Sequence, residues 1–221
     1  MANDRGKFIV IEGTDGSGKT AQFERLILAL PEGTKLGTLD FPRYGEPSSF
    51  FVQKYLSGRY GGDVGSYTAS VFYAVDRFDA RLKTLQWIEE ERRIVIANRY
   101  VASNMAHQGA KLVSKSEREK FYRWVYSLEY EIFALPKPDM NILLHVPAAI
   151  AGDLVSRRGG RHDLHEADPE HEKRAEEAYL EIAVLFPDDF HVIECAPAGT
   201  LLSPEAIHQK VWAAVAPLLQ R

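Results

Sequence analysis

Two patterns of apolar residues alternate along the chain and predict strands and helices in turn. Short runs such as "RIVIAN" and "MNILLHV" are continuously apolar, as is typical of parallel strands covered by helices on both faces. Longer segments carry apolar residues three or four positions apart, which predicts helices. The predicted strands are 8–12, 35–41, 93–98, 140–146 and 191–195. The predicted helices are 19–30, 47–57, 67–91, 117–134, 148–158, 169–185 and 204–219.

The alternation of these elements predicts an α/β fold built on one five-stranded parallel sheet with helices on both faces. No linker, repeat or low-complexity tract divides the chain, so we expect a single domain over 1–221 in which the glycine-rich stretch 56–66 is a loop. Ser116 and Glu119 have the spacing of a capping box at the start of the fourth helix. Ligands of such sheets bind beyond the carboxyl ends of the strands. Residues at those ends are therefore the candidates for function.

Composition narrows the class of protein. Of 221 residues, 45% are hydrophobic and 26% charged, as in globular domains, and the net charge of −4 opposes a broad nucleic-acid surface. No apolar run is long enough for a transmembrane helix, and the N-terminal "MANDRGK" lacks the apolar region of a signal peptide. The single cysteine, Cys195, excludes an internal disulfide and is expected to be a core residue at a strand end. We therefore expect a cytoplasmic protein with no membrane or nucleic-acid partner.

The turn after the first predicted strand carries the P-loop pattern G-x-x-x-x-G-K-[ST]. Glycines let successive backbone N–H groups point inward, which forms an anion site at the start of the next helix. In this motif the lysine reaches the β- and γ-phosphates and the hydroxyl binds Mg²⁺, so we predict a nucleoside triphosphate site with Thr20 as metal ligand. The motif alone does not separate a kinase from a GTPase. The predicted site comprises Gly13, Thr14, Asp15, Gly16, Ser17, Gly18, Lys19 and Thr20.

Polar residues also follow the second and third predicted strands. In "DFPRYGEP" (40–47), Arg43 is suited to bidentate contact with a phosphate, although a solvated arginine in a turn would look the same. In "ANRYVASNMAHQGAK" (97–111), the polar residues suit the edge of a base and a sugar, or they cap a helix that begins near Ala102. His107 has no partner at metal-ligand spacing, which argues against zinc. The polar residues of this second stretch are Arg99, Ser103, Asn104, His107 and Gln108.

Two further segments carry candidate ligand contacts. Tyr73 and Arg77 are four residues apart on one face of the long helix, where a ring and a guanidinium can stack on a pyrimidine and bind its edge. The alternative places Tyr73 in the core and Arg77 on the surface. The stretch "SRRGGRHDLHEADPE" (156–170) interrupts a helical pattern, and it is either a solvated basic loop or an arginine lid over transferring phosphates. Its arginines are Arg157, Arg158 and Arg161.

Together these motifs resemble the thymidylate kinase family over nearly the whole chain. The matching segments are "EGTDGSGKT", "FPRYG", "FYAVDR", "NRYVASN" followed by "AHQGA", "LPKPD", and the lid with "DLHEAD". The resemblance implies a P-loop NTPase-type sheet with a short lid at about 157–167. It also implies a homodimer that transfers the γ-phosphoryl group of ATP to dTMP, giving dTDP.

The resemblance assigns roles to individual residues. Asp15 would hold the sugar 3′-hydroxyl and the phosphate region, and Lys19 would act on the transferring group. Arg43 and Arg99 would bind the dTMP phosphate. Phe41 and Tyr44 would shape that end, Tyr73 would stack on thymine, Arg77 would bond its carbonyl edge, and Asn104, His107 and Gln108 would line the base and sugar pocket.

The chain departs from the family pattern at three positions, and a further position, at which members of the family differ, is also informative. Asn98 stands where a carboxylate near magnesium is usual, and Tyr73 replaces the common phenylalanine. His107 stands where an aromatic residue usually helps to exclude a 2′-hydroxyl. Gly16 stands where some members carry an arginine, so the second catalytic cation is expected from the lid, from Arg157, Arg158 or Arg161.

Two alternatives share the P-loop. A deoxynucleoside kinase, or a kinase of another monophosphate, would use the same donor site, but a deoxynucleoside kinase would not need Arg43 and Arg99 together. A GTPase-like switch would need a base-binding N-K-x-D segment, which the sequence lacks, and "LPKPD" does not replace it.

Overall fold

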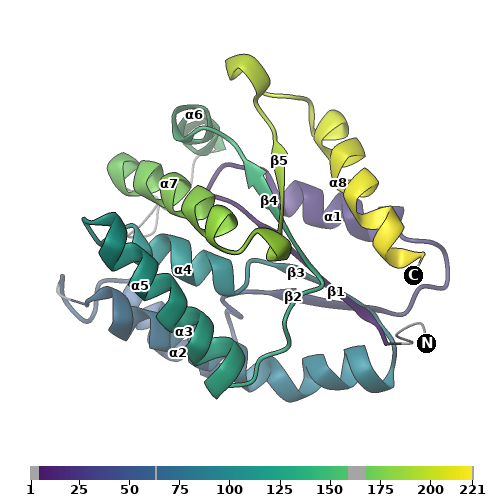
Figure 1. The fold of residues 1–221 in the computed structure, drawn as a ribbon, viewed down its shortest axis with the longest axis horizontal. Coiled ribbons are helices and arrows are strands. Elements are labelled where there is room, and N and C mark those ends of the chain that lie inside the picture. The colour runs from purple at the N-terminus through teal and green to yellow at the C-terminus, as the bar shows by residue number, and fades with distance from the viewer. Residues whose placement is uncertain (1–4, 63, 159–167, 221) are drawn as a thin grey trace.

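A computed structural model describes residues 5–62, 64–158 and 168–220 and places five strands in one parallel sheet (Figure 1). The strands lie in the order β2-β3-β1-β4-β5, so the strand that precedes the P-loop is central. Each predicted strand was right to within one residue at either end. The observed strands are β1 (Lys7–Glu12), β2 (Leu36–Asp40), β3 (Ile94–Asn98), β4 (Met140–His145) and β5 (Phe190–Glu194).

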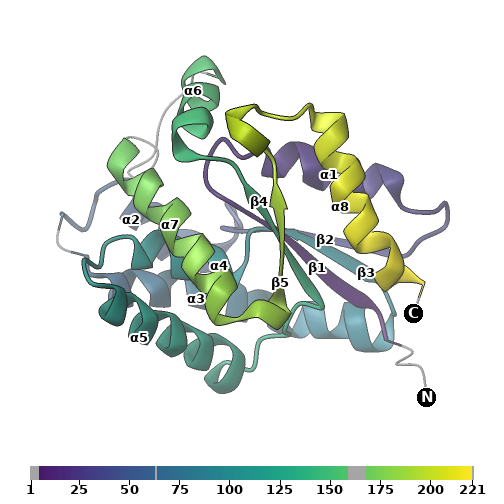
Figure 2. The ribbon, with the colours of Figure 1, turned by 45° about the horizontal axis from the view of Figure 1, so that its top comes forward.

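The sheet separates two hydrophobic cores because neighbouring residues of a strand point to opposite faces. On β1, Phe8 and Val10 face one core, and Ile9 and Ile11 face the other. The first core is covered by α3 (Ser66–Leu85), α4 (Val101–Gly109), α5 (Lys115–Tyr126) and α7 (Pro169–Leu185), and the second by α1 (Lys19–Ala29) and α8 (Pro204–Leu219), as Figures 1 and 2 both show. Both faces of the central strands are therefore buried, which explains their continuously apolar sequences.

Most helices also lie where the apolar spacing placed them. The predicted helices 67–91 and 117–134 end in π-helical turns, at Gln86–Glu90 and Ser127–Ile132. The predicted helix 47–57 begins as a 3₁₀ turn at Pro47–Ser49. The helices are α1 (Lys19–Ala29), α2 (Phe50–Leu56), α3 (Ser66–Leu85), α4 (Val101–Gly109), α5 (Lys115–Tyr126), α6 (Ala148–Arg158), α7 (Pro169–Leu185) and α8 (Pro204–Leu219).

The helix α4 is the element that the spacing of apolar residues did not predict. Every residue of α4 is buried, including Ser103, Asn104 and His107. A helix without an exposed face shows no amphipathic period. Stretch 97–111 therefore contains a helix, and the polar residues of that helix also line a cavity, so both interpretations of the stretch apply.

The capping box of α5 was predicted two residues too late. The structure has Ser114 as the N-cap: its side chain accepts from the backbone N–H of Glu117 at 3.2 Å, and the Glu117 carboxylate accepts from the backbone N–H of Ser114 at 3.3 Å. Two S-x-x-E patterns overlap here, and only the earlier one can cap a helix that begins at Lys115. Ser116 lies inside the first turn.

Two features outside the site bear on the sequence expectations. Cys195 is fully buried just after β5, and burial raises the pKa of its thiol to about 12, which fits the predicted core role. Within the described parts of the chain, no helix combines the length and the apolar character needed to cross a bilayer.

Candidate active site

The loop between β1 and α1 has the backbone of an anion-binding loop. Gly13, Gly16 and Gly18 have φ angles of +146°, +82° and +83°. A Cβ on Gly13 would lie 2.8 Å from the carbonyl oxygen of Leu144, and one on Gly16 would lie 2.3 Å from that of Ala151 in α6. The loop packs so closely on β4 and α6 that both positions exclude any side chain.

Lys19 and Asp15 form the charged part of this loop. The Lys19 ammonium donates to the carbonyl of Thr14 at 2.6 Å and lies 3.6 Å from the Asp15 carboxylate. Burial and the nearby Arg99 cation lower the pKa of Lys19 to about 8. Burial would raise the pKa of Asp15, but Arg99 and Lys19 outweigh it and hold that pKa well below its usual range. Thr20, the predicted Mg²⁺ ligand, is exposed beside them.

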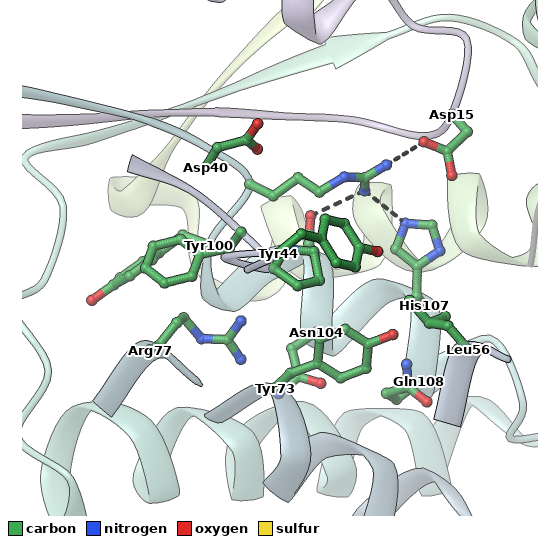
Figure 3. A pocket seen from close by; sticks show the side chains of 14 residues that line it. Asp15, Asp40, Tyr44, Leu56, Tyr73, Arg77, Tyr100, Asn104, His107 and Gln108 are labelled. Atoms are coloured by element: carbon green, nitrogen blue, oxygen red, sulfur yellow. Dashed lines mark hydrogen bonds and ion pairs between the residues drawn. The ribbon is translucent and has the colours of Figure 1, made fainter. Parts of the chain in front are cut away.

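Arg99 leaves the end of β3 and crosses to the P-loop. Its guanidinium pairs with the Asp15 carboxylate and donates to His107 Nε2 at 3.1 Å, as the dashed lines in Figure 3 show. Its backbone has φ +63°, and its N–H donates to the carbonyl of Ile11 at 2.9 Å. A non-glycine residue held in this region costs free energy and is typical of functional sites.

Glu12 organises the site, and sequence reasoning missed it. This last residue of β1 is fully buried, and its Oε1 accepts from the backbone N–H groups of Tyr100 and Ser103 at 2.8 and 3.3 Å. Its Oε2 accepts from the hydroxyls of Ser103 and Tyr179 at 2.6 and 3.1 Å. A carboxylate from the central strand thus caps the start of α4. The signal was a charged residue ending an apolar strand, "FIVIE".

A cavity of about 220 Å³ opens between the P-loop, α3 and α4. Figure 3 shows Asp15, Tyr44, Tyr73, Arg77 and other labelled side chains around it. The predicted residues that line it are Asp15, Phe41, Tyr44, Tyr73, Arg77, Arg99, Ser103, Asn104, His107 and Gln108. The lining residues that sequence reasoning did not assign are Asp40, Pro42, Leu56 and Tyr100.

The end of the cavity against α3 holds a buried ion pair. Both nitrogens Nε and Nη2 of Arg77 donate to the Glu129 carboxylate, at 2.5 and 2.7 Å, and Asn104 Nδ2 donates to the same carboxylate at 2.8 Å. Burial opposes the charge of Arg77, but Glu129 outweighs it and raises the pKa of the guanidinium. Among the described residues, Asn104 Oδ1 is buried and accepts no hydrogen bond. Arg77 is therefore not on the surface, and Asn104 offers an unused acceptor.

Arg43 lies beside the cavity rather than in its lining. Its guanidinium donates to Asp76 Oδ1 at 3.1 Å, and its Nη2 donates to Ser48 and Asp79, both at 2.6 Å. Asp76 is almost fully buried, so this arginine is fixed to α3. Its contact with an acceptor phosphate stays a prediction.

The arginines of the expected lid lie at and beyond the end of α6. Arg157 and Arg158 form the last turn of this helix, and Arg161 lies outside the described residues. The same helix contacts the P-loop where Ala151 meets Gly16. An arginine at position 16 is therefore excluded by packing, and the role of the lid stays a prediction.

Two groups of side chains could hold metal ions. Near the P-loop, Asn98 Nδ2 donates to Asp40 Oδ1 at 3.0 Å, and within the described structure Asn98 Oδ1 is buried and accepts no hydrogen bond. Burial raises the pKa of Asp40, against the hydrogen bond from Asn98. The second group contains His107, and the expectation that it has no partner at ligand distance was wrong. His171 and Glu172, in the first turn of α7, lie beside it.

Comparison with known proteins decides the family. The sequence model described as thymidylate kinase matches residues 11–210. The chain belongs to the thymidylate kinase family. A thymidylate kinase of Mycobacterium tuberculosis is 36% identical over 183 residues, which cover 79% of this chain and 85% of that protein. A probable thymidylate kinase of Pyrococcus horikoshii is 30% identical over 226 residues, covering 96% of each.

A solved thymidylate kinase of Candida albicans has the same fold. It superposes with a TM-score of 0.76 over 96% of this chain and 92% of that chain, at 20% sequence identity. The predicted P-loop kinase sheet is thus confirmed. Family membership makes the protein an ATP-dependent kinase, and the GTPase alternative is dropped.

Proposed function

We propose that the protein transfers the γ-phosphoryl group of ATP to dTMP, giving dTDP for dTTP synthesis. The observation that carries the proposal is the contact between Arg99 and Asp15. It joins the P-loop, which holds the donor phosphates, to a cavity whose far end is built for a base. The donor and acceptor phosphates then meet beside Lys19.

The far end of the cavity suits thymine. Thymine presents an N3–H donor between two carbonyl oxygens, and Asn104 Oδ1 is a buried acceptor with no partner in the described structure. Arg77 keeps N–H groups beyond those given to Glu129 and can donate to a carbonyl, while Tyr73 offers a ring face. Cytosine presents an acceptor at N3 and an amine at position 4. It therefore mismatches both groups.

The transfer step needs orientation and charge rather than a base. An oxygen of the dTMP phosphate attacks the γ-phosphorus, its bond forms while the bond to the β,γ-bridging oxygen breaks, and ADP leaves. The attacking oxygen of the dianion carries no proton, so no group must accept one. Lys19 and Arg99 stabilise the charge between donor and acceptor, and a lid arginine supplies the cation that Gly16 cannot.

Mg²⁺ fits the residues at the strand ends. Thr20, Asp15 and Asp40 offer hard oxygen atoms, and the buried Asn98 Oδ1 can accept from a metal-bound water. We propose that these residues hold the ion. When bound, Mg²⁺ neutralises charge on the phosphates.

We also propose a homodimer, because α3 carries an apolar stripe on its exposed face. The stripe residues recur at three- and four-residue spacing and share one side of the helix. A second copy of the chain buries the stripe against its own. The stripe consists of Tyr67, Val71, Val75, Phe78 and Leu82, each between 37% and 74% exposed. We propose the cytoplasm as the compartment.

A substrate panel tests the proposal. The purified protein is incubated with ATP, Mg²⁺ and either dTMP, dUMP, dCMP, AMP or thymidine, and ADP and the new nucleotide are measured by chromatography. We expect kcat/KM for dTMP to exceed that for dCMP by at least about tenfold, since one well-placed hydrogen bond discriminates by ~1–3 kcal/mol. Preferred phosphorylation of thymidine would instead show a deoxynucleoside kinase, and equal rates with AMP would refute the base pocket.

A further inference from the structure

The cluster of His107, His171 and Glu172 combines two imidazoles with one carboxylate. Each residue offers one ligand atom, and these atoms lie within 4.8 Å of one another. The two imidazole rings are stacked, with centroids 5.9 Å apart and planes at 24°. His107 comes from α4 and the other two from the first turn of α7, so the cluster joins two helices at the edge of the active site.

The environment of the cluster favours a fixed site over a loose surface group. Both histidines are buried, at 7% and 5% exposure. Glu172 Oε2 accepts from the backbone N–H of Asp15 at 3.2 Å, and within the described residues its Oε1 is buried and accepts no hydrogen bond. One carboxylate oxygen is thus tied to the P-loop, while the other is a buried acceptor without a donor.

The donor set selects the kind of ion. Two imidazole nitrogens and one carboxylate oxygen suit Zn²⁺ and similar transition metals, whereas Mg²⁺ prefers oxygen alone. Zn²⁺ binds such atoms at about 2.0–2.2 Å, so the side chains must close by roughly an ångström or more around it. Glu172 lies near the Asp15 carboxylate and near the cations Arg99 and Lys19, so charges of both signs surround the cluster.

We propose that His107, His171 and Glu172 form a binding site for a divalent transition-metal ion of the Zn²⁺ type, separate from the Mg²⁺ of the transfer reaction. The ion takes three protein ligands and leaves its fourth position to water. It ties the first turn of α7 to α4.

Metal binding opposes the hydrogen bond between Arg99 and His107. Arginine always donates, so His107 Nε2 must accept. If the ion takes Nε2, it displaces the arginine. If the ion takes Nδ1, the ring proton moves to Nε2 and faces the arginine N–H groups. Either way Arg99 loses its contact with His107 and keeps those with Asp15 and Ser103, so its guanidinium is held less firmly beside the acceptor and the ion inhibits phosphoryl transfer.

Cobalt provides a test of binding that needs no activity. The metal-free protein, without an affinity tag, is titrated with Co²⁺, whose visible absorption reports tetrahedral nitrogen and oxygen ligands. We expect one Co²⁺ per chain, displaced by Zn²⁺ but not by excess Mg²⁺. His171→Ala and the isosteric Glu172→Gln should each weaken binding by about tenfold or more. The exposed His191→Ala is the matched control and should bind as the wild type does.

Each outcome of the titration decides the proposal. Thermal unfolding of each variant shows whether it is folded, and Glu172→Gln keeps the shape of the side chain if His171→Ala does not fold. Absence of a tetrahedral spectrum overturns the site. So does a spectrum that survives in a folded Glu172→Gln or His171→Ala, because other residues would then hold the ion.

The predicted inhibition of phosphoryl transfer rests on the proposed kinase function, so it is measured in a separate experiment. With Mg²⁺ and ATP in excess, micromolar Zn²⁺ should raise KM for dTMP in the wild type and in His191→Ala. His171→Ala should resist this effect. Inhibition that is equal in all three proteins would come from zinc bound to ATP and would overturn the coupling to Arg99. If dTMP is not a substrate at all, the cobalt titration still stands by itself.

Discussion

Asn104 shows how a single residue can be satisfied on one side and unsatisfied on the other. Its Nδ2 donates to Glu129 and to the carbonyl of Ser70, at 2.8 and 3.1 Å, which fixes the side chain. Its Oδ1 is buried next to the cavity that Asn104 lines and has no donor from the described residues. Buried polar atoms normally have partners. The orphaned oxygen therefore points to a donor on the ligand.

The substitution Asn104→Leu should weaken both affinity and selectivity. Losing a buried hydrogen bond to the base costs ~1–3 kcal/mol, so kcat/KM for dTMP should fall roughly 10- to 100-fold. The preference over dCMP should shrink as well, because the acceptor proposed to reject cytosine is gone. Steady-state kinetics with both nucleotides checks this, with thermal unfolding to confirm the fold. An unchanged dTMP to dCMP ratio would contradict the assigned role.

At the residue scale, types and spacing predicted the charged residues of the P-loop and most of the cavity lining. The partners of those residues could not be predicted. The spacing of four placed Tyr73 and Arg77 on one face of a helix. It did not reveal Glu129, whose carboxylate pairs with Arg77 from a different helix. Glu12 was missed because its four donors come from two distant segments. Long-range pairs leave no periodic signal in one sequence.

At the scale of elements, the start of α5 offers a matched pair of variants. Ser114→Ala removes the N-cap that accepts from Glu117, whereas Ser116→Ala removes an exposed hydroxyl inside the first turn. Loss of an N-cap costs ~1 kcal/mol, while Ser116→Ala should be neutral or slightly stabilising. Denaturant unfolding of both variants measures the difference. A loss in Ser116→Ala with none in Ser114→Ala would mean that the helix begins at the later register.

Overlapping capping patterns explain why the boundaries of helices were less certain than their existence. The apolar spacing of α5 is the same in either register, so only the cap geometry separates the two starts. The opposite case is α4, where complete burial removed the apolar period itself. The bounds of the strands were predicted more closely, because burial on both faces gives one unbroken apolar run for each strand.

His145 joins three elements and makes their docking depend on pH. It ends β4, and its two ring nitrogens donate to Glu194 of β5 at 2.6 Å and to Glu176 of α7 at 2.9 Å. Burial would lower the pKa of His145, but the two carboxylates outweigh it and raise the pKa above its ordinary value of 6.5. The imidazolium is therefore stabilised by folding.

The sign of the pH dependence follows from that raised pKa. The contribution of His145 to stability is complete below its unfolded pKa and is lost as pH rises through the higher folded pKa. His145→Asn should thus be less stable than the wild type at about pH 6, by ~1 kcal/mol or less for a partly exposed pair, and nearly equal at about pH 8.5. Thermal unfolding at both values measures this, with His191→Asn as control. A difference that grows with pH would contradict the pairing.

At the scale of the whole molecule, the apolar stripe of α3 predicts the assembly. Val75→Glu places a charge in the middle of the stripe, and burying it against a second copy would cost several kcal/mol. We expect this variant to sediment as a monomer at concentrations where the wild type is a dimer. Leu28→Glu, on an exposed apolar residue of α1, is the control and should not change the mass. A monomeric wild type would refute the proposed interface.

The capping of α4 by Glu12 has a consequence for how this architecture can change. Glu12 immediately precedes Gly13, so one short piece of backbone fixes both the donor loop and the start of the helix beside the acceptor. The residues proposed to contact the base lie further along α3 and α4, away from that backbone. Mutations there can exchange one nucleobase for another without altering the spacing between the two phosphates. Substrate range is thus free to diverge among descendants of this chain, while the geometry of transfer is inherited intact.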